Sequence, residues 1–185
     1  MKTPARLTPK FKINISQSSR NFQAVALTRK SQFPELSQNR FTIECDKKAL
    51  TKRVQWVLSQ TVQFSSSLNI RFCDAEEMAS SNGYFRNKHY ATDVLSFPNS
   101  PQQSDSLGDL LICLPVCLLQ AKKHKVTMSS EVEKMITHGI IHLKGFDHER
   151  SESAHKIMST LERIINRQLC DELGPANWIV ARSKV

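Results

Sequence analysis

Three of the six histidines fall within one short stretch, His138-Gly-Ile-Ile-His142-Leu-Lys-Gly145-Phe-Asp-His148. Residues four apart lie on the same face of a helix, so His138 and His142 can present their imidazoles to one ion. Gly145 can adopt a left-handed conformation without steric penalty, which would turn the chain so that His148 reaches back. Three neutral imidazoles suit zinc and leave a fourth position for water. We therefore predict that these histidines bind one Zn²⁺ ion.

The same histidine spacing occurs in metzincin proteases, whose motif is H-E-x-x-H-x-x-G-x-x-H followed by a methionine turn. Those enzymes need the glutamate as the general base that takes a proton from zinc-bound water. Gly139 occupies that position here, and Met158 lies in a strongly helical pattern that favours core packing over a turn. A metalloprotease stays open as an alternative, although the missing carboxylate argues against it.

A helix must carry the first two histidines. Ser129 or Ser130 can cap a helix that continues to about residue 144, with acidic residues favourably placed in its first turn. Steps of about 100° per residue place His138 and His142 at the margin of the buried face, where residues that line a crevice belong. The predicted buried face comprises Val132, Ile136, Gly139, Ile140 and Leu143.

The remaining pattern predicts strands at 41–45, 68–73, 93–97 and 110–114. It predicts one helix after an Asp46 cap, a second from Asp74 to about residue 80, and a last helix over 153–169 that Gly174-Pro175 ends. The apolar face of that last helix would comprise Ala154, Ile157, Met158, Leu161, Ile164, Ile165 and Leu169. The expected fold is a single α+β domain with a small mixed β-sheet packed with helices, and the metal site at the C-terminal end of a core helix.

Composition narrows the class of protein. A chain of 185 residues is long enough for one domain with a hydrophobic core. The longest apolar run, at 110–119, is ten residues with Pro115 inside it, whereas a membrane-spanning helix needs about 20. We therefore predict a soluble protein, with a buried strand or turn in this run and no membrane partner. Five cysteines without a CxxC pair indicate buried free thiols in a reducing compartment, and a metal role for Cys113 and Cys117 is disfavoured because Pro115 lies between them.

The positive charge is concentrated in the N-terminal segment. Of the formal net charge of +9, residues 1–40 contribute eight basic side chains and one acidic one, or +7, which leaves +2 for residues 41–185. Total charge is therefore weak evidence that the folded part binds nucleic acid. Richness in Arg and Ser with little acid resembles an organelle transit peptide, but we favour a basic extension, with room for a first strand near residues 11–15, in a bacterial-type cytoplasmic protein.

A second motif carries a family resemblance. The stretch Asn82-Gly-Tyr-Phe-Arg86-Asn-Lys-His-Tyr-Ala-Thr92-Asp93-Val-Leu-Ser96-Phe97, followed by Leu107-Gly108-Asp109 and the histidine motif, resembles the YbeY family of endoribonucleases over about residues 41–170. Met158 and Glu162 fall where the family's last helix usually has Met and Glu. Ala91 and Ser81 depart from the usual proline and leucine, and Lys134 replaces an additional histidine of many members, but no ligand position is lost.

The resemblance implies metal ligation by His138, His142 and His148, and a functional Arg86 near the metal. It also implies single-stranded RNA as the substrate, especially in the maturation of ribosomal RNA, including the 16S 3′ end, and in ribosome quality control. Arg86 would act as the catalytic group because a guanidinium can pair with a phosphate and stabilise charge in the transition state. Arg86 and Lys88 would bind the substrate backbone. Asp147 is a candidate general base because it adjoins His148.

Other features are less specific. A second basic cluster lies at Lys122, Lys123 and Lys125, and no aromatic stacking platform is evident from the sequence. Asp93 and Asp109 are candidates either for acceptors behind the metal ligands or for structural caps.

The sequence therefore predicts a basic extension over 1–40, a zinc-dependent endoribonuclease domain over 41–170 and a C-terminal tail over 171–185. Expected partners are ribosomal RNA and ribosomal particles, with no prediction of oligomeric state. A ribosome-associated assembly factor with a structural metal is the alternative from a different class. The expected location is the cytoplasm, or an organelle if residues 1–40 are a transit peptide.

Overall fold

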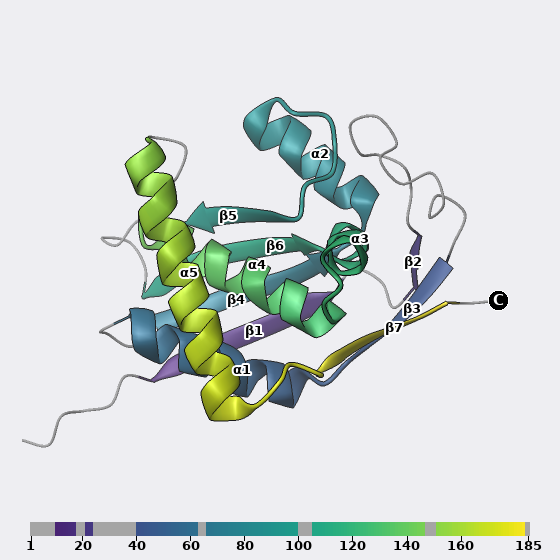
Figure 1. Ribbon diagram of the computed structural model, residues 1–185. Coiled ribbons are helices and arrows are strands. Elements are labelled where there is room, and N and C mark those ends of the chain that lie inside the picture. The colour runs from purple at the N-terminus through teal and green to yellow at the C-terminus, as the bar shows by residue number, and fades with distance from the viewer. Residues whose placement is uncertain are drawn as a thin grey trace, which may run out of the picture.

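The computed structural model describes residues 10–17, 21–23, 40–62, 66–99, 105–146 and 151–183. Its main sheet has four strands in the order β1 (Phe11–Gln17), β4 (Ser66–Cys73), β6 (Ser106–Cys113) and β5 (Val94–Pro98). β1, β4 and β6 run parallel, and β5 pairs antiparallel with β6 (Figure 1). The sheet is mixed, as predicted, and β1 includes the first strand expected near residues 11–15.

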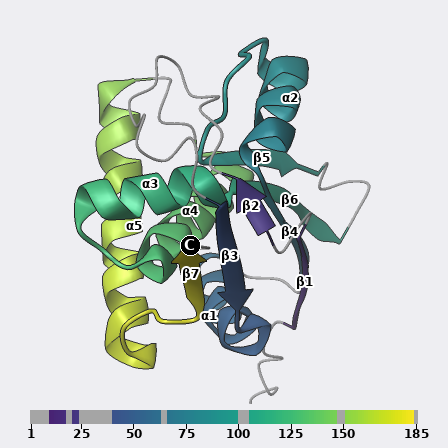
Figure 2. The same ribbon diagram turned by 90° about the vertical axis from the view of Figure 1, so that its right-hand side faces the viewer.

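Helices cover both faces of this sheet. The larger core packs α1 (Lys47–Thr61), α4 (Met128–Leu143) and α5 (Glu152–Leu173) against one face, and α4 and α5 lie together beside the sheet in Figure 2. A smaller core packs α2 (Ala75–Arg86) against the other face. Successive side chains of β6 point to opposite faces of the sheet and so pack into different cores. Leu110 and Ile112 belong to the larger core, whereas Leu111 and Cys113 belong to the smaller one.

A second, antiparallel sheet pairs two strands of the N-terminal part of the chain with the last described strand. Its order is β2 (Asn21–Gln23), β3 (Arg40–Cys45) and β7 (Ile179–Ser183). The Ser129 hydroxyl fastens β7 to α4, since it donates to the Ile179 carbonyl at 3.1 Å and accepts from the Ile179 amide at 3.0 Å. Trp178 is buried beside it. The strand of residues 179–183 is thus part of the packed fold. The prediction of a single α+β domain is confirmed.

Two helices differ from the sequence prediction. The apolar run at 110–119 is not one strand or turn, because β6 ends at Cys113 and α3 (Leu114–His124) begins directly after it. Pro115 stands in the first turn of α3, where its missing amide hydrogen costs no helical hydrogen bond. α2 was predicted to stop near residue 80 but continues to Arg86, where Asn87 adopts a left-handed conformation with φ of 54° and ends it.

Smaller corrections concern the edges of α4 and α5. The N-cap of α4 is Thr127, whose side chain accepts from the Ser130 amide, rather than Ser129 or Ser130. On α5, Met158, Ile165 and Leu169 are buried as predicted, but Ile157 and Ile164 are 55% and 41% exposed. The predicted apolar face was therefore too wide. All five cysteines are free thiols, and Cys73, Cys113 and Cys117 are buried. Within the described residues no helix is long and apolar enough to cross a membrane.

Candidate active site

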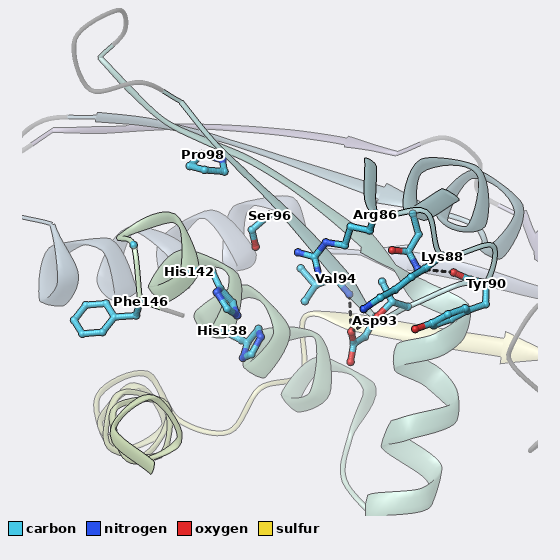
Figure 3. A pocket seen from close by; sticks show the side chains of 13 residues that line it. Arg86, Lys88, Tyr90, Asp93, Val94, Ser96, Pro98, His138, His142 and Phe146 are labelled. Carbon is cyan, nitrogen blue, oxygen red and sulfur yellow. Dashed lines mark hydrogen bonds between the residues drawn. The ribbon is translucent and has the colours of Figure 1, made fainter. Parts of the chain in front are cut away.

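A cleft of about 790 Å³ opens between α4, strand β5 and the end of α2. Its walls bring together the two sequence motifs, which lie far apart along the chain. Figure 3 shows the histidines in the middle of this cleft, with Phe146 at one end and the basic side chains of Arg86 and Lys88 at the other. The residues that line the cleft are Asn82, Arg86, Lys88, Tyr90, Thr92, Asp93, Val94, Ser96, Pro98, His138, His142, Gly145 and Phe146.

α4 presents His138 and His142 to the cleft as neighbours. Their ring centroids are 4.5 Å apart and the ring planes are inclined by 71°. Both residues are half-buried, whereas Ile136, Gly139 and Ile140 between and beside them face the core. The prediction that the two histidines share one margin of the buried face is therefore confirmed.

Glu162 of α5 holds one of the two rings. Its Oε1 lies 2.7 Å from His138 Nδ1, and the two side chains are only 14% and 22% exposed. A carboxylate accepts the Nδ1 proton, which leaves the Nε2 lone pair of His138 available to a metal ion. The hydroxyl of Thr137, next to His138, also donates to Asn166 Oδ1 at 2.9 Å. This bond links α4 to α5 a second time. The sequence suggested Glu162 by family position but assigned it no contact.

The two described histidines fit a metal ion in their chemistry and spacing. The expected third ligand, His148, and the candidate base Asp147 lie outside the described residues, and among those described there is no group of three potential ligand side chains. Gly145 has φ of 86°, and its amide donates to the His142 carbonyl at 2.8 Å. This is the left-handed turn predicted after the second histidine. Ligation by His148 stays a prediction.

Gly139 faces the sheet rather than the cleft. A Cβ atom at this position would lie 2.6 Å from Leu110 Cδ2 and 3.2 Å from Ser96 Oγ. Leu110 is 1% exposed and packed in the core, so the contact cannot be relieved without repacking. A glutamate, the general base of the metzincin motif, would fit here only if the Leu110 side chain moved.

The extension of α2 explains the spacing of the second motif. Asn82 and Arg86 are four residues apart on one helix and therefore share a face. The buried Asn82 side-chain amide donates to the Tyr90 carbonyl at 2.8 Å, and the backbone carbonyl of Asn82 accepts from the Lys88 amide at 3.2 Å. These bonds fix the loop after the helix. Arg86 and Lys88 consequently face the cleft from opposite sides of the Asn87 turn.

The two aspartates near the strands have structural partners. Asp93 accepts from the Val94 amide at 2.9 Å and from Gln120 Nε2 at 2.9 Å, which ties the start of β5 to α3. Asp109 accepts from Asn69 Nδ2 at 2.6 Å across β4 and β6. These contacts favour the structural alternative for both. The lysines at 122, 123 and 125 lie at the end of α3 and are not among the residues that line the cleft.

Paired imidazoles opposite a guanidinium in a recessed cleft are the groups with which hydrolases act on phosphate esters. The sequence model of the family "Endoribonuclease YbeY" matches residues 35–169. The chain belongs to this family of endoribonucleases, and so to the nuclease class of hydrolases.

Individual relatives agree with this membership. The chain is 39% identical over 133 residues to an endoribonuclease YbeY of Coxiella burnetii, with 67% of this chain and 86% of the relative covered. It is 37% identical over 121 residues to that of Polynucleobacter asymbioticus, with 65% of this chain and 76% of the relative covered. The solution structure of a Thermotoga maritima protein shares the fold, with a TM-score of 0.56 at 20% identity over 87% of this chain and 91% of the other.

Proposed function

We propose that this protein is a zinc-dependent endoribonuclease that cleaves single-stranded RNA. We propose ribosomal RNA, including the 3′ end of the 16S molecule, as its substrate, and ribosomal particles in the cytoplasm as its place of action. The observation that carries the proposal is the single cleft in which His138 and His142, the former held by Glu162, lie opposite Arg86. Membership in an endoribonuclease family supplies the class of substrate.

His138 and His142 would hold the metal, together with His148 as the predicted third ligand. Zinc bound by three imidazoles would polarise a phosphoryl oxygen or lower the pKa of a bound water to about 7. Glu162 keeps the His138 ring in one orientation and one tautomer, so the ligand atom needs no rearrangement on binding.

Arg86 and Lys88 would bind and orient the RNA backbone. A guanidinium binds phosphate oxygens with two parallel hydrogen bonds, and its charge can stabilise the additional negative charge of the transition state. Lys88 adds a second positive charge two residues on, and both lie across the cleft from the imidazoles. Arg86 and Lys88 form what we call the basic wall of the cleft. The backbone of a bound RNA strand would therefore be held between this basic wall and the histidines that would hold the metal.

The test is cleavage of an unstructured RNA by the full chain, before and after chelation, with metal content measured on the same sample. His138→Ala and Arg86→Glu are each expected to abolish cleavage, and chelation is expected to do so reversibly. Lys123→Glu is the matched control for charge reversal, because Lys123 is exposed at the end of α3 outside the cleft. Cleavage that persists in both cleft variants would overturn the proposal.

Retained co-sedimentation with ribosomal particles by His138→Ala, without any cleavage by the unmodified chain, would instead support the assembly-factor alternative. The protease alternative gains no support from the site, because Gly139 cannot be replaced by the required glutamate without displacing the Leu110 side chain.

A further inference from the structure

Two large aromatic side chains are exposed near the C-terminal end of α2. Tyr84 is 85% exposed and Phe85 is 60% exposed, and both immediately precede Arg86 at the end of α2. Single exposed apolar residues are common on protein surfaces, but contiguous exposed apolar groups mark interaction sites. Both rings belong to α2, and the last residue of this helix, Arg86, lines the cleft.

Contacts with other aromatic rings hold the two exposed rings in place. The Tyr84 and Phe85 ring centroids are 4.8 Å apart in an edge-to-face arrangement, and Phe85 is in turn 4.8 Å from Phe97 of β5. Phe97 packs against the smaller hydrophobic core. The three rings, which we call the aromatic ladder, thus run from the core to the surface. A ladder fixed at its base loses little conformational entropy when a flat ligand stacks on its outer rings.

The surroundings of the aromatic ladder select the kind of partner. Residues 82–90 contain Arg86 and Lys88 but no aspartate or glutamate. A partner that complements this surface must combine negative charge with flat aromatic groups at short, regular spacing. An unpaired strand of RNA has both, since each nucleotide carries one phosphate and one base whose face is free to stack.

We propose that Tyr84 and Phe85 form a base-stacking platform that binds unpaired nucleotides next to the phosphate held by Arg86. The inference rests on the proposed function and adds the determinant of single-strand preference, because a base inside a duplex cannot offer its face to the ladder. The ladder is absent from the sequence prediction, which found no aromatic platform. Phe97 is distant in the sequence, so only the folded chain brings it to Phe85.

The experiment measures the affinity of the full chain for a fluorescein-labelled single-stranded decamer of adenylate by anisotropy, with EDTA present to block metal-dependent cleavage. Stacking contributes a factor of about 5 to 150 per base on alanine substitution. Tyr84→Ala and Phe85→Ala are each expected to weaken binding at least about fivefold. Phe85→Leu keeps an apolar side chain but removes the π face, so it is expected to weaken binding similarly, whereas Phe85→Trp is expected to retain it. Val180→Ala, at an exposed apolar position on β7, is the control and should bind as the unmodified chain does.

A second probe separates stacking from a loss of folding. The unmodified chain should bind the same decamer with abasic positions in place of bases more weakly than it binds the intact decamer. Phe85→Ala should bind the abasic decamer as tightly as it binds the intact one. Thermal unfolding of each variant checks that the fold is kept, and the highly exposed Tyr84 provides a variant whose truncation does not disturb the core.

The outcomes distinguish the platform from the proposed function. If Arg86→Glu loses binding while Tyr84→Ala and Phe85→Ala bind as the unmodified chain does, the platform is wrong and the endoribonuclease stands. Unchanged binding by Phe85→Leu would also overturn the platform, since it would show an apolar contact without stacking. Absence of both RNA binding and RNA cleavage by the unmodified chain would overturn the two proposals together.

Discussion

Replacement of Glu162 tests how far the proposed metal site depends on a residue that is not itself one of the proposed ligands. Glu162 Oε1 and His138 Nδ1 are 2.7 Å apart, and both side chains are largely shielded from solvent. Glu162→Ala removes the acceptor that fixes the His138 tautomer and leaves Nδ1 without this partner. We expect the affinity for Zn²⁺ to fall because the ring must then be oriented at the moment of binding.

The size of the effect follows from the contact. A hydrogen bond to a charged group contributes about 1.5–3 kcal/mol, which corresponds to a factor of about 10–150 in an equilibrium constant. This range overlaps the loss of about 10–100-fold that is usual when the partner of a histidine ligand is removed. The measurement is a competition titration of the metal-free full chain with Zn²⁺ against a chromophoric chelator. Glu162→Gln retains an oxygen acceptor and should fall between Glu162→Ala and the unmodified chain.

Glu172→Ala is the matched control. It removes the same charge from the same helix, at an exposed position near the end of α5. If Glu162→Ala and Glu172→Ala changed the affinity equally, the effect would be one of overall charge. An affinity of Glu162→Ala within about threefold of the unmodified chain, far below the factor expected for the lost contact, would refute the role assigned to Glu162.

Three further predictions concern residues that do not line the cleft. Gly108→Ala should lower the free energy of unfolding by about 3 kcal/mol or more in urea titration, because φ is 139° and the new Cβ would strike a β5 carbonyl oxygen. Arg53→Ala should lower it by about 3–5 kcal/mol, since the buried Glu133 carboxylate would lose its ion pair, and the double substitution Arg53→Met with Glu133→Leu should recover part of the loss in the same titration. Burial raises the pKa of the Cys45 thiol to about 11, so its thiolate fraction at pH 8 is about 0.1%. Peptide mapping after iodoacetamide should show the exposed Cys170 modified well before Cys45, with the Cys45 rate rising about tenfold per pH unit up to pH 11.

The sequence predicted the parts of the site that lie close together along the chain. His138 and His142 are related by one helical turn, so periodicity alone places them on one face and at its margin. The left-handed Gly145 follows from the same local logic, since glycine is the residue that ends a helix most readily in that conformation. These predictions needed no tertiary information.

Errors arose where one residue type serves two structural purposes. Pro115 inside an apolar run indicated an interrupted strand, but the first turn of a helix accepts proline equally well, and α3 begins there. The helix after Asp74 was predicted to end near residue 80. The helix instead persists to Arg86 because the buried Asn82 makes its hydrogen bonds with the following loop rather than ending the helix.

Contacts between distant segments were beyond reach of the sequence patterns. Glu162 meets His138 because α4 and α5 pack together, with Thr137 and Asn166 bonded at the same level. Phe85 meets Phe97 because α2 returns over the face of β5. Family position drew attention to Glu162, but its contact, and with it a physical role, comes only from the packing of the two helices.

Gly139 shows how one position joins the packing of the fold to its chemistry. The histidine pair requires α4 to present one margin to the cleft. The helical period then turns residue 139 toward the sheet, where a Cβ atom would come within 2.6 Å of the Leu110 side chain. The close approach of α4 to β5 and β6 that glycine permits also brings the imidazoles within one cleft of Arg86. A side chain at 139 would therefore require the Leu110 side chain to move. The same glycine that removes the protease base from this position thus also permits the close packing of α4 on the sheet beside the cleft.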